Sequence, residues 1–434
     1  MPQQVYFVGS QSEVAHHAAP LADQVQYQIV PVDGIVEKCQ PGDLAIFYSE
    51  HFDHFRDAIR KLKSQNVATL CMIDGILEWR NAWENRVDEP ACPFAMRPIL
   101  SHKVACIGFS QARILQDWGN QGKVEIVGIP RFDCLVKSEN AAKFENKDAE
   151  HRNRVLVMTA KCPAYTDQQQ HLLLESLQDL KKFFDGRPDL EPFWRLTANL
   201  DRELGVENQL NELTGAELAS QLKLVGAVIT TPSTAALESM ILDKPTAVLD
   251  YNACPSYFQA AWNINSRDHL APVISELVDP TEIKMLFQRQ CLSFELCQNG
   301  NASDRMADLI QQMLRFSSQV TDGEMRFPES MLPPVSPQLV NFDHASLYPQ
   351  YSDFQNDDVT QLQTELAHSR REIKHLQNQL AQIQTELGQA HKIFDEINNH
   401  PIAGPVVKLR QKWFDLMRKL KIVKSARPEP NGLP

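Results

Sequence analysis

The stretch VITTPSTAALESMILDKP, residues 228–245, combines small hydroxyl side chains with one carboxylate at a spacing that suits nucleotide binding. An apolar run is followed by a polar turn, and the pattern predicts a helix that begins near Thr234. The hydroxyls of Thr231, Ser233 and Thr234 cluster at the helix start, where free backbone N–H groups favour phosphate. Glu238 lies one turn further along the same face, where a carboxylate could accept hydrogen bonds from a ribose diol.

The same stretch also fits an ordinary helix start. Ser and Thr are common N-cap residues, and a glutamate in an early turn suits the helix dipole. A capping box needs Glu or Gln three residues after the cap, and those positions hold Ala236 and Leu237. Glu238 is therefore not a capping-box partner, and nucleotide binding and plain capping both stay open.

Two more candidates stand at the predicted carboxyl ends of strands. Asp74 ends an apolar run and precedes Gly75, so we expect it to face a ligand site and to serve as a general base. The alternative is an Asp-Gly turn without catalytic function. Lys161 follows the apolar run 155–158, where its ammonium group could meet a diphosphate or stay a plain surface lysine.

Six further residues, Gly75 among them, are candidates for acceptor or phosphate contacts. His16 and His17 follow the first apolar run, although they could equally be solvated loop histidines. Trp79 and Arg80 could stack on or bond to a sugar, or fold into the core. Arg131 could bind phosphate, or pair with Asp133 near a domain boundary.

The elements that must position these residues alternate between short apolar runs and amphipathic segments. Continuous Val/Ile-rich runs, rather than strict alternation, indicate parallel sheets covered on both faces. We predict an α/β fold with two tandem Rossmann-like domains facing a cleft and a C-terminal coiled coil. The predicted parts are an acceptor domain (1–137), a nucleotide-donor domain (152–318), a linker (319–358), the coiled coil (359–399) and a basic amphipathic tail (400–434).

The coiled-coil prediction rests on spacings of three and four that repeat without a slip from Val359 to Ile397. Ten of these twelve positions are large and apolar, which is typical of a heptad repeat and favours a parallel dimer or trimer. The alternative is a lone amphipathic helix that folds back on the α/β domains. In the tail, residues 405–427 carry eight Lys or Arg and one Asp, which suits an anionic membrane surface or a partner protein.

Composition limits the remaining possibilities. The chain has 434 residues and a net charge of −12, so general nucleic-acid binding is not expected. Its nine cysteines include no Cys-x-x-Cys pair, which indicates a reducing compartment without a zinc site. The N-terminus lacks the pattern of a signal peptide, and no apolar run is long enough to span a bilayer. We therefore expect a cytoplasmic protein, with possible peripheral contact to the inner membrane face.

Residues 226–251 resemble the donor-binding stretch of glycosyltransferases with the GT-B fold, which consists of two Rossmann domains. The resemblance is to the bacterial surface-polysaccharide branch that includes CDP-glycerol glycerophosphotransferases, and more distantly to UDP-N-acetylglucosamine 2-epimerase. VGIPRFD (127–133) is similar to the element that closes the first domain of these enzymes. LCMIDGILEWRN (70–81) resembles their acceptor-side loop, and the likeness covers about residues 1–316.

The resemblance implies that Ser233 and Thr234 hold the phosphates of a nucleotide and that Glu238 holds its ribose. This chain has Asp74-Gly75 where the CDP-glycerol enzymes typically carry His-Gly. No Asp-x-Asp motif is present, so a metal-independent reaction is expected, with the nucleotide-sugar as co-substrate and no cofactor.

The leading prediction is therefore a glycosyltransferase that moves a sugar from a nucleotide-sugar donor to a surface-glycan or lipid-linked acceptor, and that forms a homo-oligomer through its coiled coil. One alternative is a polyol-phosphate transferase or a nucleotide-sugar epimerase on the same fold. Another is a non-catalytic coiled-coil scaffold whose cleft senses a nucleotide.

Overall fold

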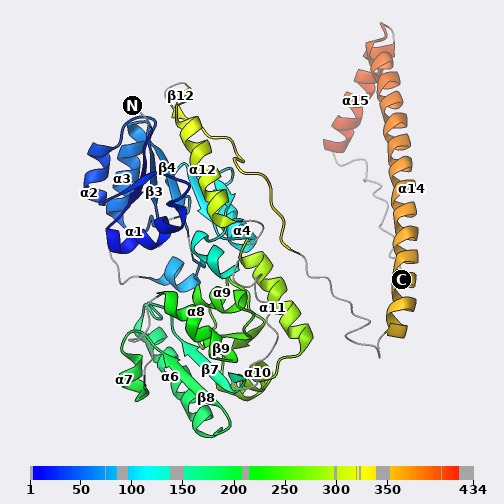
Figure 1. Ribbon diagram of the computed structural model, residues 1–434. Coiled ribbons are helices and arrows are strands. Elements are labelled where there is room, and N and C mark those ends of the chain that lie inside the picture. The colour runs from blue at the N-terminus through cyan, green and yellow to red at the C-terminus, as the bar shows by residue number, and fades with distance from the viewer. Residues whose placement is uncertain are drawn as a thin grey trace. The chain divides into compact units, whose positions relative to one another are not determined.

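The computed structural model consists of two units, Met1–Phe342 and Asp343–Pro434, which we treat separately (Figure 1). The described residues are 3–73, 75–85, 96–136, 151–207, 215–297, 301–318, 320–321, 324–338, 352–401 and 403–419. Three earlier predictions fall wholly or partly outside them: the base Asp74, much of the linker (319–358), and the tail beyond residue 419.

Unit 1 begins with a parallel sheet of six strands in the spatial order β2-β1-β3-β4-β5-β6. The strands are β1 (Val5–Val8), β2 (Tyr27–Val30), β3 (Leu44–Phe47), β4 (Ala68–Met72), β5 (Lys103–Cys106) and β6 (Val124–Ile126). All six were predicted from their apolar runs. In β1, β3 and β4 every residue is buried, as expected for strands covered on both faces.

Helices cover both faces of this sheet. Val5 and Phe7 of β1 point toward one cluster of apolar side chains, which α1 and α12 complete. Tyr6 and Val8 point to the opposite face and pack with α2 and α3. The helical segments are α1 (Gln11–Ala18), η1 (Ala19–Leu21), α2 (Val32–Lys38), α3 (Asp53–Ser64), the π-helix η2 (Arg80–Glu84), α4 (Phe109–Asp117) and η3 (Pro130–Phe132).

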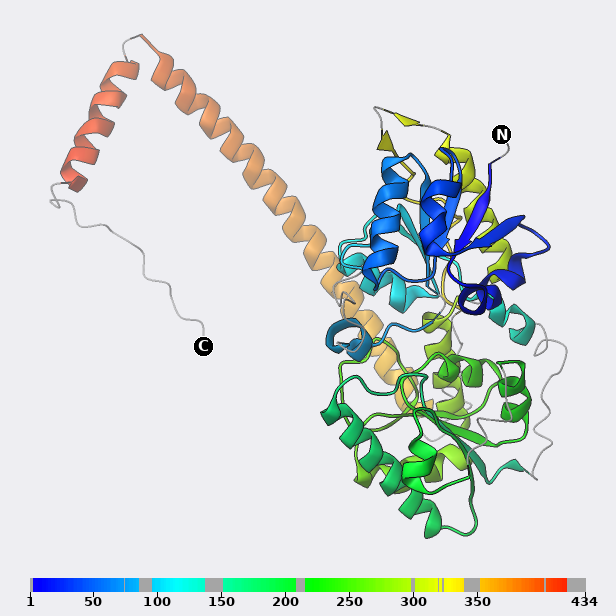
Figure 2. The same ribbon diagram turned by 90° about the vertical axis from the view of Figure 1, so that its left-hand side faces the viewer.

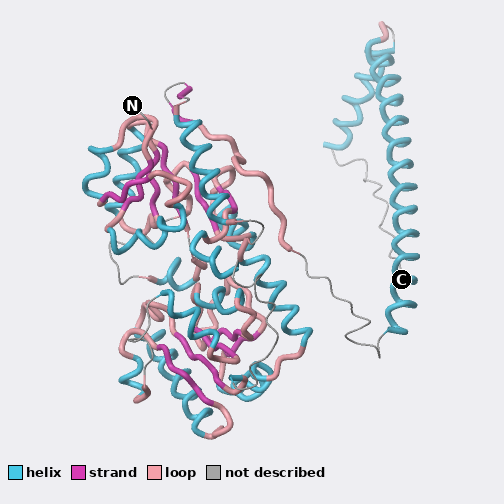
Figure 3. The backbone as a smooth tube through the Cα atoms, in the orientation of Figure 1, coloured by secondary structure: helices cyan, strands magenta, loops and turns pink. Residues whose placement is uncertain are grey.

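A second parallel sheet follows, with five strands in the order β11-β10-β9-β7-β8 (Figure 3). The strands are β7 (Arg154–Met158), β8 (Glu191–Arg195), β9 (Ala227–Thr230), β10 (Thr246–Leu249) and β11 (Trp262–Ile264). Strand β11 was not predicted, because its three residues are too few to form a recognisable apolar run. The two α/β layers are thus the tandem Rossmann-like arrangement that the alternation of elements predicted.

The second sheet is also doubly covered. Val155 and Val157 of β7 pack with α6 and α10, while Leu156 and Met158 pack with α8. The helices are α6 (Asp167–Asp185), α7 (Leu200–Leu204), α8 (Gly215–Lys223), α9 (Ala235–Ile241), η6 (Arg267–His269), α10 (Leu270–Val278) and α11 (Glu282–Glu295).

The chain then returns to the first sheet through α12 (Ala302–Ser317) (Figure 1). Met306, Ile310 and Met313 of this helix are fully buried against the first sheet. The domain boundaries inferred from the sequence assign α12 to the second domain. Its packing on the first sheet was not predicted, because local patterns do not reveal long-range partners. After the short strands β12 (Val320–Thr321) and β13 (Glu324–Met325), Met331 and Leu332 join the same core.

Unit 2 contains two helices, α14 (Ser352–Asn399) and α15 (Ala403–Lys419), joined by a short connection (Figure 2). Helix α14 covers the whole predicted heptad segment, and its 48 residues correspond to a length of about 72 Å. Among the described residues, no helix has a run of apolar residues that would cross a membrane.

Candidate functional site

The strand order reverses at one place in each sheet, and such switch points are where open α/β sheets bind ligands. In the second sheet the reversal lies between β7 and β9, which are neighbours in space. Their carboxyl ends lead into residues 159–161 and 231–234 respectively. The hydroxyl-rich turn and Lys161, which the sequence nominated separately, therefore meet at the same switch point.

Hydroxyl groups tie the loops at this switch point together. Thr231 is almost fully buried, and its Oγ1 accepts a hydrogen bond from the backbone N–H of Ala160 at 2.7 Å. The hydroxyls of Thr159 and Thr197 lie 2.9 Å apart, and Thr197 donates to the carbonyl of Ala160 at 2.5 Å. Thr231 was nominated for phosphate binding, and its hydroxyl oxygen also holds the loop that carries Lys161.

Ser233 and Thr234 are both half-buried at the start of α9. Ser233 Oγ lies 3.1 Å from Thr230 Oγ1, and Thr234 makes no side-chain cap hydrogen bond to the helix. Plain capping by the Thr234 side chain, one of the two interpretations left open by the sequence, is therefore not seen. However, α9 has only seven residues, so its dipole alone is a weak source of positive potential and cationic side chains become important.

Glu238 faces Arg131 from the other half of unit 1. Arg131 Nη1 lies 3.1 Å from Glu238 Oε1, and the side chains are 28% and 13% exposed. The sequence left open whether Arg131 pairs with Asp133 instead. Asp133 accepts hydrogen bonds from the backbone N–H groups of Ala302 and Ser303 at 2.9 and 2.8 Å, so it holds the start of α12 and leaves Arg131 to Glu238.

A second guanidinium, which the sequence analysis missed, lies close to the same carboxylate. Arg195 ends β8 opposite Met158 of β7, and its Nε is buried without a hydrogen-bond partner among the described residues. Burial lowers the pKa of Arg195, while the nearby Glu238 carboxylate acts in the opposite direction. Arginine still remains a cation at neutral pH. Lys161 is exposed and forms no ion pair with a described residue.

The carboxyl ends of the two sheets approach each other at the hydroxyl-rich turn. The backbone N–H of Ile76, just after β4, donates to Thr234 Oγ1 at 3.2 Å. A Cβ atom on Gly75 would lie 2.6 Å from that hydroxyl oxygen, so the close approach requires glycine here. Gly75 was predicted as an acceptor-side residue, and its close approach to Thr234 gives a structural reason for glycine at this position. Asp74 itself is not among the described residues.

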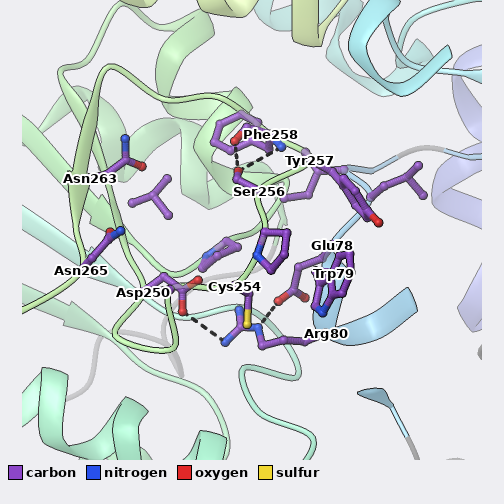
Figure 4. Close-up of a pocket in the computed structure, with 16 residues that line it drawn as sticks. Glu78, Trp79, Arg80, Asp250, Cys254, Ser256, Tyr257, Phe258, Asn263 and Asn265 are labelled. Atoms are coloured by element: carbon purple, nitrogen blue, oxygen red, sulfur yellow. Dashed lines mark hydrogen bonds and ion pairs between the residues drawn. The ribbon is translucent and has the colours of Figure 1, made fainter. Parts of the chain in front are cut away.

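Pro232 of the same turn helps to line a pocket, which Figure 4 shows in close-up. It is lined from the first half of the unit by residues 76–80, and from the second by residues that follow β10 and by two asparagines at β11. The second half thus contributes the polar side chains of Asp250, Asn263 and Asn265. This wall of the pocket could not be predicted from the sequence, because β11 was not recognised as a strand.

Arg80 lines the pocket, but its guanidinium is already engaged. The side chain is 2% exposed and forms an ion pair with Glu78, while Nη1 lies 3.9 Å from Asp250 Oδ1 and donates to the carbonyl of Pro163 at 3.2 Å (Figure 4). Burial raises the pKa of Glu78, although Arg80 acts against this. Arg80 therefore links the two halves of unit 1, a role that only long-range contacts reveal.

Trp79 also lines the pocket, with its ring beside those of Trp83 and Tyr257 at centroid distances of 5.5 and 5.8 Å. Its Nε1 donates to Glu84 at 3.1 Å, so one edge is held while the ring forms part of an aromatic wall. Aromatic faces of this kind suit the apolar faces of sugar rings as well as protein packing.

The two histidines lie on α1, which follows β1 at the switch point of the first sheet and runs beside η3, the turn that carries Arg131. The rings of His16 and His17 are 3.7 Å apart, and His17 stacks with Tyr48 at 6.2 Å. Both histidines therefore lie in the first half of unit 1, on the helix beside the turn that carries Arg131. Within the described part of the chain, no cluster of three or more His, Cys, Asp or Glu is placed to hold a metal ion.

No family model and no curated protein sequence matches the chain. Solved structures do match. They include the wall teichoic acid polymerase TagF, with 13% identity, a TM-score of 0.49, and coverage of 73% of this chain and 89% of that one. For S. aureus MnaA with UDP the identity is 13%, the TM-score 0.48 and the coverage 73% and 97%.

The UDP-GlcNAc 2-epimerase of Methanocaldococcus jannaschii, in complex with UDP-GlcNAc and UDP, has 11% identity and a TM-score of 0.47, over 71% of this chain and 99% of that one. These proteins are of the kinds that the sequence resemblance names. The arrangement of two doubly wound parallel sheets is evident from the strand orders themselves.

Proposed function

We propose that unit 1 is a transferase that binds a nucleoside diphosphate sugar at the β7–β9 switch point and transfers the sugar to an acceptor hydroxyl. The observation that carries the proposal is the half-buried side chain of Arg195, whose Nε has no hydrogen-bond partner within the described part of the chain and lies where such sheets bind ligands. A buried donor without an acceptor is costly in free energy, and an anionic ligand oxygen would satisfy it.

The surrounding groups suit the parts of such a donor. Arg195, Arg131 and Lys161 supply positive charge for a diphosphate, and the Ser233 and Thr234 hydroxyls supply short hydrogen bonds. Glu238 is placed to accept from ribose hydroxyls once Arg131 turns from the carboxylate toward phosphate. The departing diphosphate develops negative charge in the transition state, and fixed cations stabilise that charge.

The pocket beside Pro232 is the natural place for the transferred sugar, because it adjoins the proposed phosphate site. Its Asp250, Asn263 and Asn265 can hydrogen-bond hydroxyls, and Trp79 and Tyr257 offer aromatic faces. Asp74 remains our proposal for the general base, since its neighbour Gly75 closely approaches Thr234.

The test is a thermal-shift screen of the full chain against nucleoside diphosphates and their sugar, polyol and polyol-phosphate derivatives. A ligand that binds the folded state raises the melting temperature. We expect at least one nucleoside diphosphate to do so, and Arg195→Ala to weaken its binding by about tenfold or more. Arg202→Ala, an exposed arginine on α7, is the matched control. Equal affinity in both variants would refute the donor site.

Turnover separates an enzyme from a nucleotide sensor. Donor hydrolysis or transfer, followed by nucleotide release, should be lost in Asp74→Asn while nucleotide affinity is kept. A donor that binds but is never consumed, with any acceptor glycan or polyol, would favour the scaffold alternative. Release of a nucleoside monophosphate instead of a diphosphate would identify polyol-phosphate transfer.

A further inference from the structure

Helix α14 carries an apolar stripe that no described residue of unit 2 covers. Its exposed heptad side chains range from 42% exposed at Ile397 to 61% exposed at Leu362, and Ile383 and Leu387 are 59% and 56% exposed. Stripes of this length on a stable helix require a partner, because the free energy of helix formation in proteins comes mostly from packing such a face. Helix α15 follows α14 closely but leaves the stripe exposed.

The spacing assigns each residue a heptad position. Val359, Leu366, Ile373, Leu380, Leu387 and Phe394 occupy position a, and Leu362, Ser369, Leu376, Ile383, Ala390 and Ile397 occupy position d. The flanking position g is acidic or neutral apart from one apolar residue: Asp358, Glu365, Glu372, Gln379, Glu386 and Ile393. The other flanking position, e, is neutral or basic: Gln363, Arg370, Gln377, Gln384, His391 and Asn398.

This asymmetry selects a partner and a direction. In a parallel pair of identical helices, position g faces position e of the next heptad on the partner. Glu365 then meets Arg370 of the second copy, Glu386 meets His391, and no pair of like charges results. In an antiparallel pair the acidic g positions face each other, which costs free energy. We propose that α14 pairs in parallel and in register with α14 of a second copy of this chain.

Cysteine crosslinking of the full chain tests the direction. Ser369→Cys and Ala390→Cys place a thiol at d positions, where identical residues of a parallel pair are adjacent. Each variant alone should form a dimer on a non-reducing gel after mild oxidation. Gln382→Cys, on the outward face, is the control and should stay largely monomeric. The native cysteines all lie between residues 39 and 297. Oxidation of the wild-type chain therefore measures the crosslinking that these cysteines cause.

Sedimentation equilibrium of the full chain gives the mass. We expect twice the 49.3 kDa of one chain at micromolar concentration. Leu376→Asp combined with Leu380→Asp should return the mass to a single chain, while the melting transition of unit 1 is kept. Gln382→Asp with Gln389→Asp, outside the stripe, should not. A wild-type monomer, or crosslinking only when Ser369→Cys and Ala390→Cys chains are mixed, would overturn the proposal.

A charge swap tests the register independently. Glu365→Arg places like charges opposite Arg370 of the partner at two symmetric contacts. The dissociation constant of the dimer should therefore rise roughly two- to fivefold. Adding Arg370→Glu restores opposite charges in the parallel register and should restore affinity. Failure of the second change to rescue the first would exclude this register.

A separate observation concerns α15, whose apolar face is also exposed: Val406, Leu409, Trp413 and Leu416 are 54–70% exposed. At helical spacing these residues form one sector, with Arg410 on one side of it and Lys412 on the other. A basic rim around an apolar face with a Trp suits the anionic headgroups and the acyl boundary of a lipid bilayer. We infer that α15 lies on an anionic membrane surface.

Vesicle sedimentation with the full chain tests this inference. The protein should pellet with vesicles that contain phosphatidylserine or phosphatidylglycerol, and much less with pure phosphatidylcholine. Leu409→Gln with Trp413→Gln should abolish pelleting, and Gln411→Ala on the opposite face should not change it. Equal pelleting of both variants, or equal pelleting with neutral vesicles, would refute the inference.

Discussion

Two of the carboxylate–cation pairs in unit 1 look alike in composition but differ in their surroundings. Lys103 and Glu125 lie 2.9 Å apart and are 1% and 3% exposed. Lys103 also donates to the backbone carbonyls of Gly122 and Glu329. Glu125 also accepts from the backbone N–H groups of Met331 and Leu332. Arg131 and Glu238 are more exposed and pair at 3.1 Å across the two halves of the unit.

This contrast distinguishes ion pairs that stabilise the fold from ion pairs that belong to a ligand-binding site. The Lys103–Glu125 pair has its hydrogen bonds satisfied within the protein and fastens residues 329–332 to the first sheet. The Arg131–Glu238 pair lies beside Arg195, whose buried Nε has no partner among the described residues. A pair that neighbours an unsatisfied cation can exchange partners when an anion arrives, whereas a fully satisfied pair cannot do so without loss of stability.

The largest expected effect is on the structural pair. Lys103→Met leaves the Glu125 carboxylate buried without its cation, so unfolding by denaturant should require about 3–5 kcal/mol less than in wild type. Lys61→Met, at an exposed position of α3, should change stability by less than about 0.5 kcal/mol. A similar, small change in both variants would show that the buried pair is not structural.

The next effect should appear in binding rather than stability. Glu238→Gln keeps the shape of the side chain but removes the charged acceptor, so nucleoside diphosphate affinity should fall roughly 10- to 100-fold by isothermal titration. The melting temperature without ligand should change little. If Glu238→Gln instead unfolds the protein and leaves the affinity of the remaining folded fraction intact, Glu238 belongs with the structural pairs.

A third carboxylate sharpens the comparison, because it is buried with neutral partners. Glu295 accepts from Ser110 Oγ at 3.0 Å and from the backbone N–H of Gln259 at 3.2 Å. Burial raises its pKa to about 7, although these hydrogen bonds act in the opposite direction. The unfolded chain releases this proton near pH 4.3, about the ordinary value for glutamate, while the folded chain keeps it until near neutrality.

Stability should therefore fall as the pH rises from about 4.5 to 7, by at most about 1.4 kcal/mol per pH unit from this group. Glu295→Gln should remove this slope. Denaturation midpoints of both proteins at pH 5.5 and 8 measure it, and an unchanged pH dependence in the variant would contradict the assignment.

The smallest expected effect is on the stability of the exposed pair. Arg131→Ala should lower the free energy of unfolding by less than about 1 kcal/mol, because water screens a partly exposed ion pair. The measurement is the same denaturant titration as for Lys103→Met. A loss as large as that of Lys103→Met would erase the distinction between the two pairs.

Except for the three-residue strand β11, local sequence patterns were sufficient for the strands of the two parallel sheets, because Val/Ile-rich runs are typical of strands buried on both faces. They also identified the hydroxyl-rich turn and Lys161, which adjacent strands bring to one edge. Arg195 could have been found by the same reasoning, since it stands at the carboxyl end of a predicted strand, but its neighbours in the sequence carry no motif.

Long-range partners could not be inferred in this way. Nothing near Arg80 in the chain indicates that Asp250 and Pro163 will surround it, and nothing near α12 indicates that it returns to the first sheet. Thr231 was chosen by type and position, yet its hydroxyl serves Ala160. Each of these outcomes depends on which surfaces the fold brings together, and a single sequence does not record that.

The short connection between α14 and α15 has a consequence for how the chain meets a surface. In the proposed parallel pair, two copies of α15 emerge at the same end of the rod. Once one of them touches lipid, the second is held at a high effective concentration near the bilayer, so the pair gains avidity that a single chain lacks. Even weakly lipid-binding helices would then give long residence, and dissociation of the α14 pair would release both chains together.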